Sequence, residues 1–448
     1  MQENQFTNGK ILRPLLRFAV PVLLALLLQA LYGAVDLMVV GKFSETADIS
    51  AVATGSQIMQ SLTTVVTGLT TGVTVLLGHR IGEEKPKEAG RVIGSGICLF
   101  AILAAVLTVL FVVFARGIAV IMQAPAAAME PTTDYVRICS AGMVFITGFN
   151  VIGSVFRGIG DSKMPLITVA IACVVNVCGD LLLVGGFGLG AAGAALATVF
   201  AQAVSVVISL RIIAKRPMPF SFSRKELGLH REDVYGILRL GVPVALQDLL
   251  VSLSFLVIMA IVNGLGLTES AGVGVAEKIC AFIMLIPSAA AQAMSAFVAQ
   301  NIGAGKPDRA RKALACGIAV SVACGVAMAY LSFFHGPMLT RIFADGDEAV
   351  VAAAADYLKA YAIDCLLTCF LFCFIGYFSG LGRTVFVMAQ GIAGAFLVRI
   401  PVSYFVSRIH GVRLFYIGLA TPCSTVVQVL LFLLYALWLK KRKNISVL

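Results

Sequence analysis

Two acidic side chains lie within strongly apolar stretches of this chain. Asp36 comes five residues before Gly41, and Asp180 comes five residues before Gly185. An ionisable side chain costs roughly 2.5–3.5 kcal/mol at the centre of a membrane-spanning helix, so its presence there needs a reason. Two neighbouring carboxylates cannot both ionise cheaply, and such a pair can share a proton or bind a cation. The two aspartates are therefore the first candidates for ion binding.

An amide and a hydroxyl accompany these acids at a similar depth. Asn176 lies one helical turn before Asp180 on the same face, and Thr198 lies eight residues into the next apolar stretch. At about 1.5 Å per residue, the two acids lie roughly 7–8 Å below the outer membrane edge and Thr198 lies roughly 12 Å below it. Oxygen ligands suit a hard cation. We expect one cation-coupling site, for Na+ or for a shared proton, formed by Asp36, Asn176, Asp180 and Thr198. The alternative is that the acids are only hydrogen-bonded near the interface.

Composition identifies the surroundings of these residues. Of the 448 residues, 59% are hydrophobic and 13% are charged, and the mean hydropathy is +0.97. A soluble domain carries roughly 25% charged residues. Strand-like alternation, which a β-barrel requires, is not apparent, so we expect an all-α integral membrane protein. About 20 apolar residues span a bilayer, and twelve stretches qualify: 14–40, 49–78, 92–114, 135–158, 164–184, 191–214, 236–263, 270–299, 313–334, 357–381, 384–407 and 415–439.

The chain repeats itself. The segment LRFAVPV at residues 16–22 returns as LRLGVPV at residues 238–244. Ile-Gly, Lys-Pro and Gly-x-Gly elements recur at the same offset of 221 or 222, at 81–82 and 302–303, 85–86 and 306–307, and 158–160 and 380–382. A duplicated set of membrane helices is typical of secondary transporters. We expect two pseudo-symmetric six-helix bundles, residues 1–213 and 236–448, joined by a cytoplasmic linker at residues 214–235.

Basic residues indicate the orientation. If the N-terminus is cytoplasmic, 25 of the 34 Lys and Arg residues fall in or beside inner loops and five fall in outer loops. This bias follows the positive-inside rule, and it explains the net charge of +11 without nucleic acid. We expect a multi-pass protein of the cytoplasmic (inner) membrane with both termini in the cytoplasm. The two copies then have the same orientation and are parallel repeats.

The second half carries a different polar set. Glu277, Asp364 and Arg399 each lie seven or eight residues from an outer span end. Their mixed charges suggest a buried ion-pair network, which is either structural or functional. Asp248 lies in the middle of a span without a partner visible in the sequence, and it is a candidate for lining the cavity.

A proline inside the first span is a candidate hinge. Pro21 removes a backbone hydrogen bond and permits a kink. The kink is either static or mobile. If it is mobile, the helix that carries Asp36 can bend when that carboxylate takes up a proton.

Other chemistries lack their motifs. The 11 cysteines form no CxxC pair or Cys/His cluster, and no cofactor other than a coupling ion is expected. We find no nucleophile–base arrangement or nucleotide motif, so we do not expect an enzyme. A flippase for a lipid-linked saccharide precursor is the main alternative, and it would need a basic cavity. A channel is disfavoured because no pore-lining ring recurs in both halves.

Several motifs resemble those of the multidrug and toxic compound extrusion (MATE) family. They are the Pro21 helix that leads to VDLMVVG at residues 35–41, GIGDSK at 158–163, NVCGD at 176–180 and GAALAT at 193–198. The resemblance covers about residues 14 to 440. It implies a V-shaped pair of six-helix bundles that exports organic cations, amphipathic drugs or metabolites in exchange for H+ or Na+, by alternating access. The family's cation site in the N-terminal bundle maps onto the four residues proposed above.

The second half departs from one branch of this family. That branch has acidic residues in its seventh and tenth helices, where this chain has Val251 and Thr368 at the nearest matching positions. Asp248 and Asp364 lie about one turn away. This departure favours coupling through the N-terminal bundle. We expect a monomer that binds a small-molecule substrate and membrane lipid, and no nucleic acid.

Overall fold

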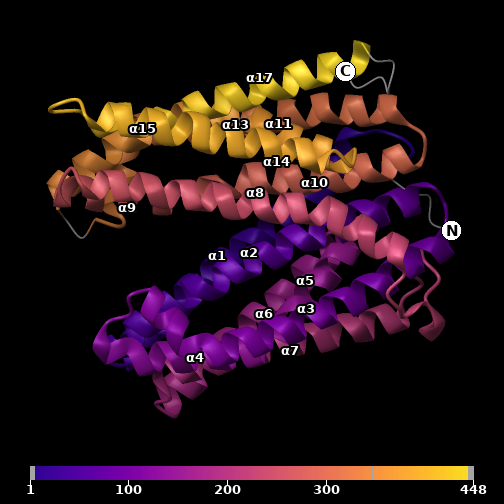
Figure 1. Cartoon of the computed structure of the whole chain (residues 1–448), viewed down its shortest axis with the longest axis horizontal. Helices are drawn as coiled ribbons and strands as arrows, with labels where there is room; N and C mark the ends of the chain where they lie inside the picture. The colour runs from indigo at the N-terminus through magenta and orange to yellow at the C-terminus, as the bar shows by residue number, and fades with distance from the viewer. Residues whose placement is uncertain (1–5, 345–346, 442–448) are drawn as a thin grey trace. The chain divides into compact units, whose positions relative to one another are not determined.

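The computed structural model describes residues 6–344 and 347–441, and these residues form helices joined by short connections, with no strand among them (Figure 1). Eleven helices are long and apolar enough to cross a membrane, and a twelfth span results if one bent pair is counted. All twelve stretches expected from the sequence coincide with these helices. The all-helical membrane fold with twelve spans is therefore confirmed. The outermost terminal segments, residues 1–5 and 442–448, which were expected in the cytoplasm, lie outside the described residues.

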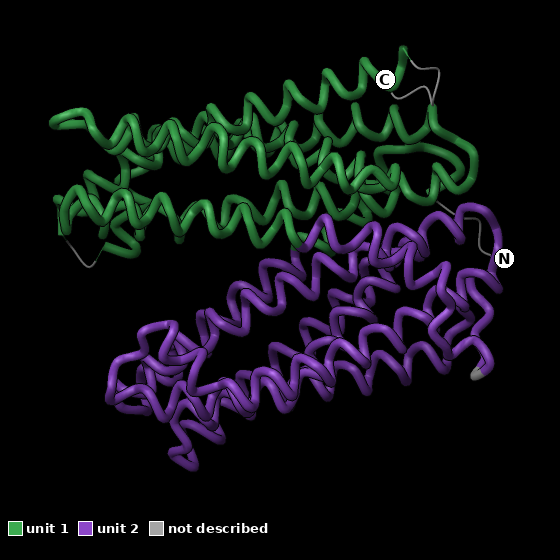
Figure 2. The backbone as a smooth tube through the Cα atoms, in the orientation of Figure 1, with its two compact units in different colours: residues 1–23, 246–448 green, residues 24–245 purple. Residues whose placement is uncertain are grey.

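The helices pack into two compact units, drawn in different colours in Figure 2. One unit contains residues 24–245, and the other contains residues 1–23 and 246–448. Both boundaries fall inside long helices, two residues after a proline: Pro21 in α1 (Leu12–Phe43) and Pro243 in α8 (Arg231–Asn263). Packing and the sequence repeat thus divide the chain at different residues, and the expected boundaries at 213 and 236 stay a prediction.

The unit of residues 24–245 contains the second part of α1 and the next five spans. Its elements are α2 (Thr46–Gly82), α3 (Pro86–Ile121), η1 (Ala126–Ala128), α4 (Met129–Ala141), α5 (Met143–Gly158), α6 (Lys163–Asp180), η2 (Leu181–Gly186), α7 (Gly190–Lys215), η3 (Arg224–Glu226) and the start of α8. The expected span 135–158 is the pair α4 and α5, which is bent by 53°. The bend falls at Gly142, where an added Cβ would lie 2.4 Å from a methyl group of Val199.

The connection between the two repeats packs across α3. Ser221 donates its backbone N–H to the carbonyl of Pro86 at 3.0 Å. Gly94 lets this connection approach closely, because a Cβ there would lie 2.0 Å from the carbonyl oxygen of Glu226. Arg91 then pairs with the buried carboxylate of Asp233 at 2.7 Å, at the start of α8.

The other unit contains the first part of α1 and the rest of the chain after residue 245. Its elements are the end of α8, α9 (Leu267–Ile283), α10 (Leu285–Gly303), α11 (Pro307–Phe334), α12 (Gly336–Arg341), α13 (Glu348–Gly380), α14 (Thr384–Ile392), η4 (Ala393–Arg399), α15 (Ile400–Ser407), α16 (Leu414–Gly418) and α17 (Ala420–Lys441). Helix α9 ends at Ile283, four residues before Pro287. A proline ring clashes with the carbonyl four residues earlier and donates no hydrogen bond to it, which accounts for the break between α9 and α10.

Candidate functional site

Three helices of the unit formed by residues 24–245 bring the expected polar residues together. Helix α1 carries Asp36, helix α6 carries Asn176 and Asp180, and helix α7 carries Thr198. The carboxyl groups of Asp36 and Asp180 lie within hydrogen-bonding reach of each other. Asp36 is 5% exposed, and Asn176 and Asp180 are almost completely buried. The structure thus brings the two acids together, as their similar positions within the spans predicted.

Small residues and a helix cap set the positions of α6 and α7. An added Cβ at Gly179 would lie 2.9 Å from the Cβ of Ala197, so the two helices approach closely beside Asp180 and Thr198. At the start of α7, the carboxylate of Asp48 accepts the backbone N–H of Ala191 at 2.9 Å. A carboxylate stabilises a helix N-terminus because it satisfies a free N–H group and complements the helix dipole.

The site has more acceptors than donors. Asn176 Nδ2 donates to Thr198 Oγ1 at 3.4 Å. Among the described side chains, nothing donates a hydrogen bond to Asp36 Oδ1, to either carboxylate oxygen of Asp180 or to Asn176 Oδ1, although all four atoms are buried. A buried acceptor without a partner carries the desolvation cost of that group. A proton on one carboxyl group, or a bound cation, would reduce this cost.

The surroundings of Asp36 include groups that sequence reasoning missed. Tyr32, Tyr135 and Cys139 all lie close enough to Asp36 for its charge to act on them. Tyr32 precedes Asp36 by four residues on α1, so its presence on the same helix face could have been predicted. Tyr135 and Cys139 come from α4, whose direction depends on the bend at Gly142, and no sequence signal pointed to them.

The helix changes its winding directly after Asp180. The α-helical hydrogen bonds of α6 give way to the π-helical segment η2 over Leu181–Gly186. Such segments are rare and occur frequently at functional sites. A second π-helical segment, η4, ends at Arg399 in the other unit.

In the unit formed by residues 1–23 and 246–448, three of the four expected polar residues gather around one tyrosine. The charges of Glu277, Asp364 and Arg399 all act on the buried Tyr357. Asp364 is hydrogen-bonded to Thr425, and its charge interacts with that of Arg399.

Arg399 is also held by helix α8. It donates from Nη1 to Ser254 Oγ at 3.2 Å and lies 4.4 Å from the ring centre of Phe255. Asp248 is half-buried, and no charged group among the described residues acts on it. The role of this cluster stays a prediction.

Within residues 6–344 and 347–441, no group of three or more His, Cys, Asp or Glu side chains is arranged to hold a metal ion. The four-residue set around Asp36 contains only two such side chains.

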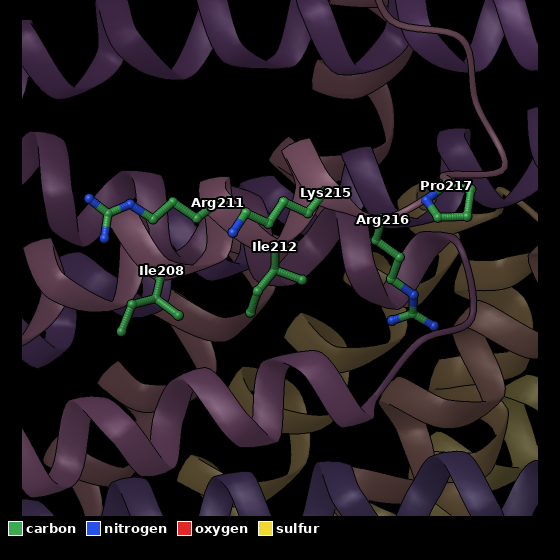
Figure 3. A pocket seen from close by; sticks show the side chains of 6 residues that line it. All are labelled: Ile208, Arg211, Ile212, Lys215, Arg216 and Pro217. Atoms are coloured by element: carbon green, nitrogen blue, oxygen red, sulfur yellow. The ribbon is translucent and has the colours of Figure 1, made fainter.

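A hollow of about 420 Å³ lies at the opposite end of α7 from its Asp48 cap. Figure 3 shows its lining, three basic and three apolar residues: Ile208, Arg211, Ile212, Lys215, Arg216 and Pro217. Arg216 is paired with Asp161 at 2.8 Å, whereas Arg211 and Lys215 are exposed. The hollow lies far along α7 from Thr198, so it is separate from the carboxylate pair.

The repeated helical architecture, with acidic side chains buried in its spans, defines a multi-span membrane transporter. The chain belongs to the MatE family, because the family model matches residues 21–182 and 243–405, one match in each repeat. The MATE resemblance inferred from the motifs is thereby confirmed, and members of this family are transporters, not enzymes.

Similar proteins agree with this assignment. The probable multidrug resistance protein YoeA of Bacillus subtilis (strain 168) is 26% identical over 447 residues, which cover 98% of this chain and 96% of that protein. The multidrug export protein MepA of Staphylococcus saprophyticus subsp. saprophyticus is 23% identical, covering 96% of this chain and 95% of that protein. A crystal structure of MATE in complex with MaL6 has a TM-score of 0.93 at 19% identity, covering 99% of this chain and 100% of that chain, which shows the same fold.

Proposed function

We propose that this protein is a secondary active antiporter that exports organic cations or other amphipathic compounds in exchange for H+ or Na+ by alternating access. Membership of the MatE family and the names of its multidrug relatives support export as the activity. The observation that carries ion coupling is the buried pair Asp36–Asp180, whose carboxyl groups lie within hydrogen-bonding reach while their remaining acceptors have no donor among the described residues.

The coupling follows from the electrostatics of this pair. A carboxylate pair in a buried site favours one proton over two charges. Proton uptake from the outside changes the charge of the site, which favours the state that releases substrate, and proton loss to the cytoplasm favours the state that binds it. An ion can shift this equilibrium only by its differential affinity for the two states. We favour H+ over Na+ because the two carboxyl groups are close enough to share one proton.

Efflux from proteoliposomes tests this proposal. Substrate efflux is measured under an imposed pH gradient and, separately, under an imposed Na+ gradient. We expect Asp36→Asn and Asp180→Asn each to reduce gradient-driven efflux at least about tenfold, because an amide side chain does not take up or release a proton at the pH values of the assay. Glu130→Gln, which alters an exposed ion pair with Arg116, serves as the control and should retain efflux. Full gradient-driven efflux by both site variants would refute the role of the pair.

We further propose that the protein acts as a monomer in the cytoplasmic membrane, with both termini inside, and that it binds membrane lipid. The hollow at the end of α7 supports the lipid proposal, because exposed Arg211 and Lys215 adjoin apolar Ile208 and Ile212. Basic residues beside the cytoplasmic end of a spanning helix attract anionic lipid headgroups.

A further inference from the structure

A polar stripe runs along helix α2 inside its apolar span. Six exposed or half-buried residues recur at intervals of three or four, or lie next to one another: Gln57, Gln60, Ser61, Thr64, Thr67 and Thr71. At about 100° per residue they share one face that is about 120° wide. Ser61 and Thr64 donate their hydroxyl groups to carbonyls of their own helix. Exposed glutamines within a span are costly against lipid, so this face borders a water-filled space.

Helix α5 continues this polar surface. Asn150 Oδ1 accepts a hydrogen bond from Thr67 Oγ1 at 3.0 Å, which joins the two helices. Gly153 and Arg157 follow Asn150 at helical spacing, and all three are half-buried. The apolar side chain of Ile152 lies at least about 100° away from all three around the helix axis. Arg157 therefore lies on the face that carries polar groups rather than on the lipid-facing side.

The guanidinium group of Arg157 points away from the nearby helix end. An added Cβ at Gly153, one turn earlier, would lie 3.3 Å from Arg157 Nη1. Side chains of a helix lean toward its N-terminus, which here leads into the span. A side chain that only escaped the bilayer would extend toward the closer end of the helix instead. This cation is therefore held along the water-facing surface.

Arg157 differs from three other arginines at this end of the unit. Arg80, Arg91 and Arg216 each form an ion pair, with Glu83, Asp233 and Asp161 respectively. Within the described part of the chain, no acidic side chain pairs with Arg157, and no charged group acts on its guanidinium group. A half-buried guanidinium group without a carboxylate partner favours binding of an external anion.

The repeat shows that the adjacent turn does not require arginine. Arg157 precedes the Gly158–Gly160 turn, and the corresponding position before the Gly380–Gly382 turn is Ser379. Gly160 and Gly382 adopt nearly the same positive φ angles, 84° and 75°. The two turns thus form with either residue, and the charge of Arg157 serves another purpose.

We propose that Arg157 binds an acidic group, a carboxylate or phosphate, of the transported compound, so that the protein accepts amphipathic anions or zwitterions in addition to cations. This inference deepens the proposed function and rests on it for the direction of transport. The planar guanidinium group can donate two parallel hydrogen bonds to such a group. The polar stripe of α2 contacts the other polar groups at the same end of the transported compound. The apolar part of the compound takes no part in the contact with Arg157.

Binding to the purified full-length protein in phosphatidylcholine nanodiscs tests the inference. Fluorescein and rhodamine 123 share a xanthene body but carry negative and positive charge respectively, and fluorescence anisotropy reports binding of each. We expect Arg157→Gln and Arg157→Ser to weaken fluorescein binding by about tenfold, the effect of one charge-assisted pair of about 1.4 kcal/mol. Rhodamine 123 binding should change by less than about twofold, and Arg157→Lys should retain part of the fluorescein affinity.

The serine variant guards against misfolding, because Ser379 occupies the corresponding turn. Arg216→Gln removes an arginine from the same end of the unit and should leave both affinities unchanged. Absence of fluorescein binding to the unaltered protein, or equal losses for both probes, would overturn the inference. If efflux shows no ion coupling but the charge-selective loss occurs, the antiport proposal fails while the anion site stands.

Discussion

The amide of Asn176 and the hydroxyl of Thr198 distinguish a proton site from a sodium site. A proton needs only the carboxyl pair of Asp36 and Asp180, whereas a hard cation needs several oxygen ligands. For the proton, we expect Asn176→Leu and Thr198→Val to keep pH-driven efflux within about threefold of the unaltered protein. The measurement is initial efflux under a pH gradient with Na+ absent.

The matched control is Thr198→Ser, which keeps the hydroxyl group that accepts from Asn176. Efflux driven by a Na+ gradient in the unaltered protein, and its loss in Asn176→Leu and Thr198→Val with retention in the serine variant, would instead identify a sodium site. The same four residues would then act as ligands rather than as proton acceptors.

Residue-level reasoning succeeded where depth within a span decided contact. Asp36 and Asp180 meet, and both come five residues before a glycine near the end of their spans, a spacing that can be read from the sequence. It failed for Tyr135 and Cys139, whose approach to Asp36 depends on the path of α4. It also missed the polar stripe of α2, although Gln, Ser and Thr at intervals of three or four inside an apolar span could have been found by helical periodicity.

At the scale of elements, Pro21 lies close to the point at which α1 continues from one compact unit into the other. A proline inside a helix costs about 3 kcal/mol relative to alanine, since it breaks a hydrogen bond and introduces a clash. We expect Pro21→Ala to raise the thermal unfolding temperature and to slow efflux at least several-fold, because α1 bends less readily. Both quantities are measured on the same purified variant.

Pro86 provides the comparison, because it occupies the first turn of α3, where a proline leaves no additional hydrogen bond unmade. Pro86→Ala should therefore change the efflux rate little. A Pro21→Ala variant that is stabilised but transports at the normal rate would show that the kink is static. Pro243, at the equivalent place in α8, allows the same test in the second repeat.

The packing of the connecting segment against α3 predicts a position-specific effect of glycine substitution. A Cβ at Gly94 would lie 2.0 Å from the carbonyl oxygen of Glu226, whereas a Cβ at Gly96 would meet nothing nearer than 3.6 Å. We expect Gly94→Ala to destabilise the unit by about 1–3 kcal/mol through overpacking. Gly96→Ala should be neutral or stabilising, because alanine favours a helix by about 1 kcal/mol over glycine.

Thermal unfolding of the two glycine variants, followed in detergent, checks this expectation. Equal unfolding temperatures for Gly94→Ala and Gly96→Ala would mean that the connecting segment moves aside without cost. The close approach could not be predicted from the sequence, because the spacing of four positions from Gly90 to Gly94 indicates only a helix face of small residues. What covers that face is decided by the path of residues 216–230, which carry no periodic pattern.

At the scale of the whole molecule, the number of spans was the most predictable property and the packing units were the least. Length and apolarity alone determine a span, and all twelve expected stretches match helices. The units divide α1 and α8 internally, since one part of each helix packs with residues 24–245 and the other part packs with residues 1–23 and 246–448. Hydropathy gives no sign of such a change of partners, and the two prolines were its only local marker.

The bias of basic residues and the repeat together predict one orientation for equivalent positions in the two copies. Glu45 and Leu267 are exposed at corresponding positions that we expect on the outer side, and Lys87 and Asp308 are exposed at corresponding positions that we expect on the inner side. In a cysteine-free parent, we expect Glu45→Cys and Leu267→Cys to react with a membrane-impermeant maleimide on intact cells. Lys87→Cys and Asp308→Cys should react only after the membrane is opened, since charged loops rich in Lys and Arg stay inside. Reaction from outside of the outer position of one copy and the inner position of the other copy would exclude a parallel repeat, whereas exchange of both pairs would place the termini outside. The expected pattern would also place Asp36 in the outer half of the bilayer, because parallel copies share one orientation in the membrane.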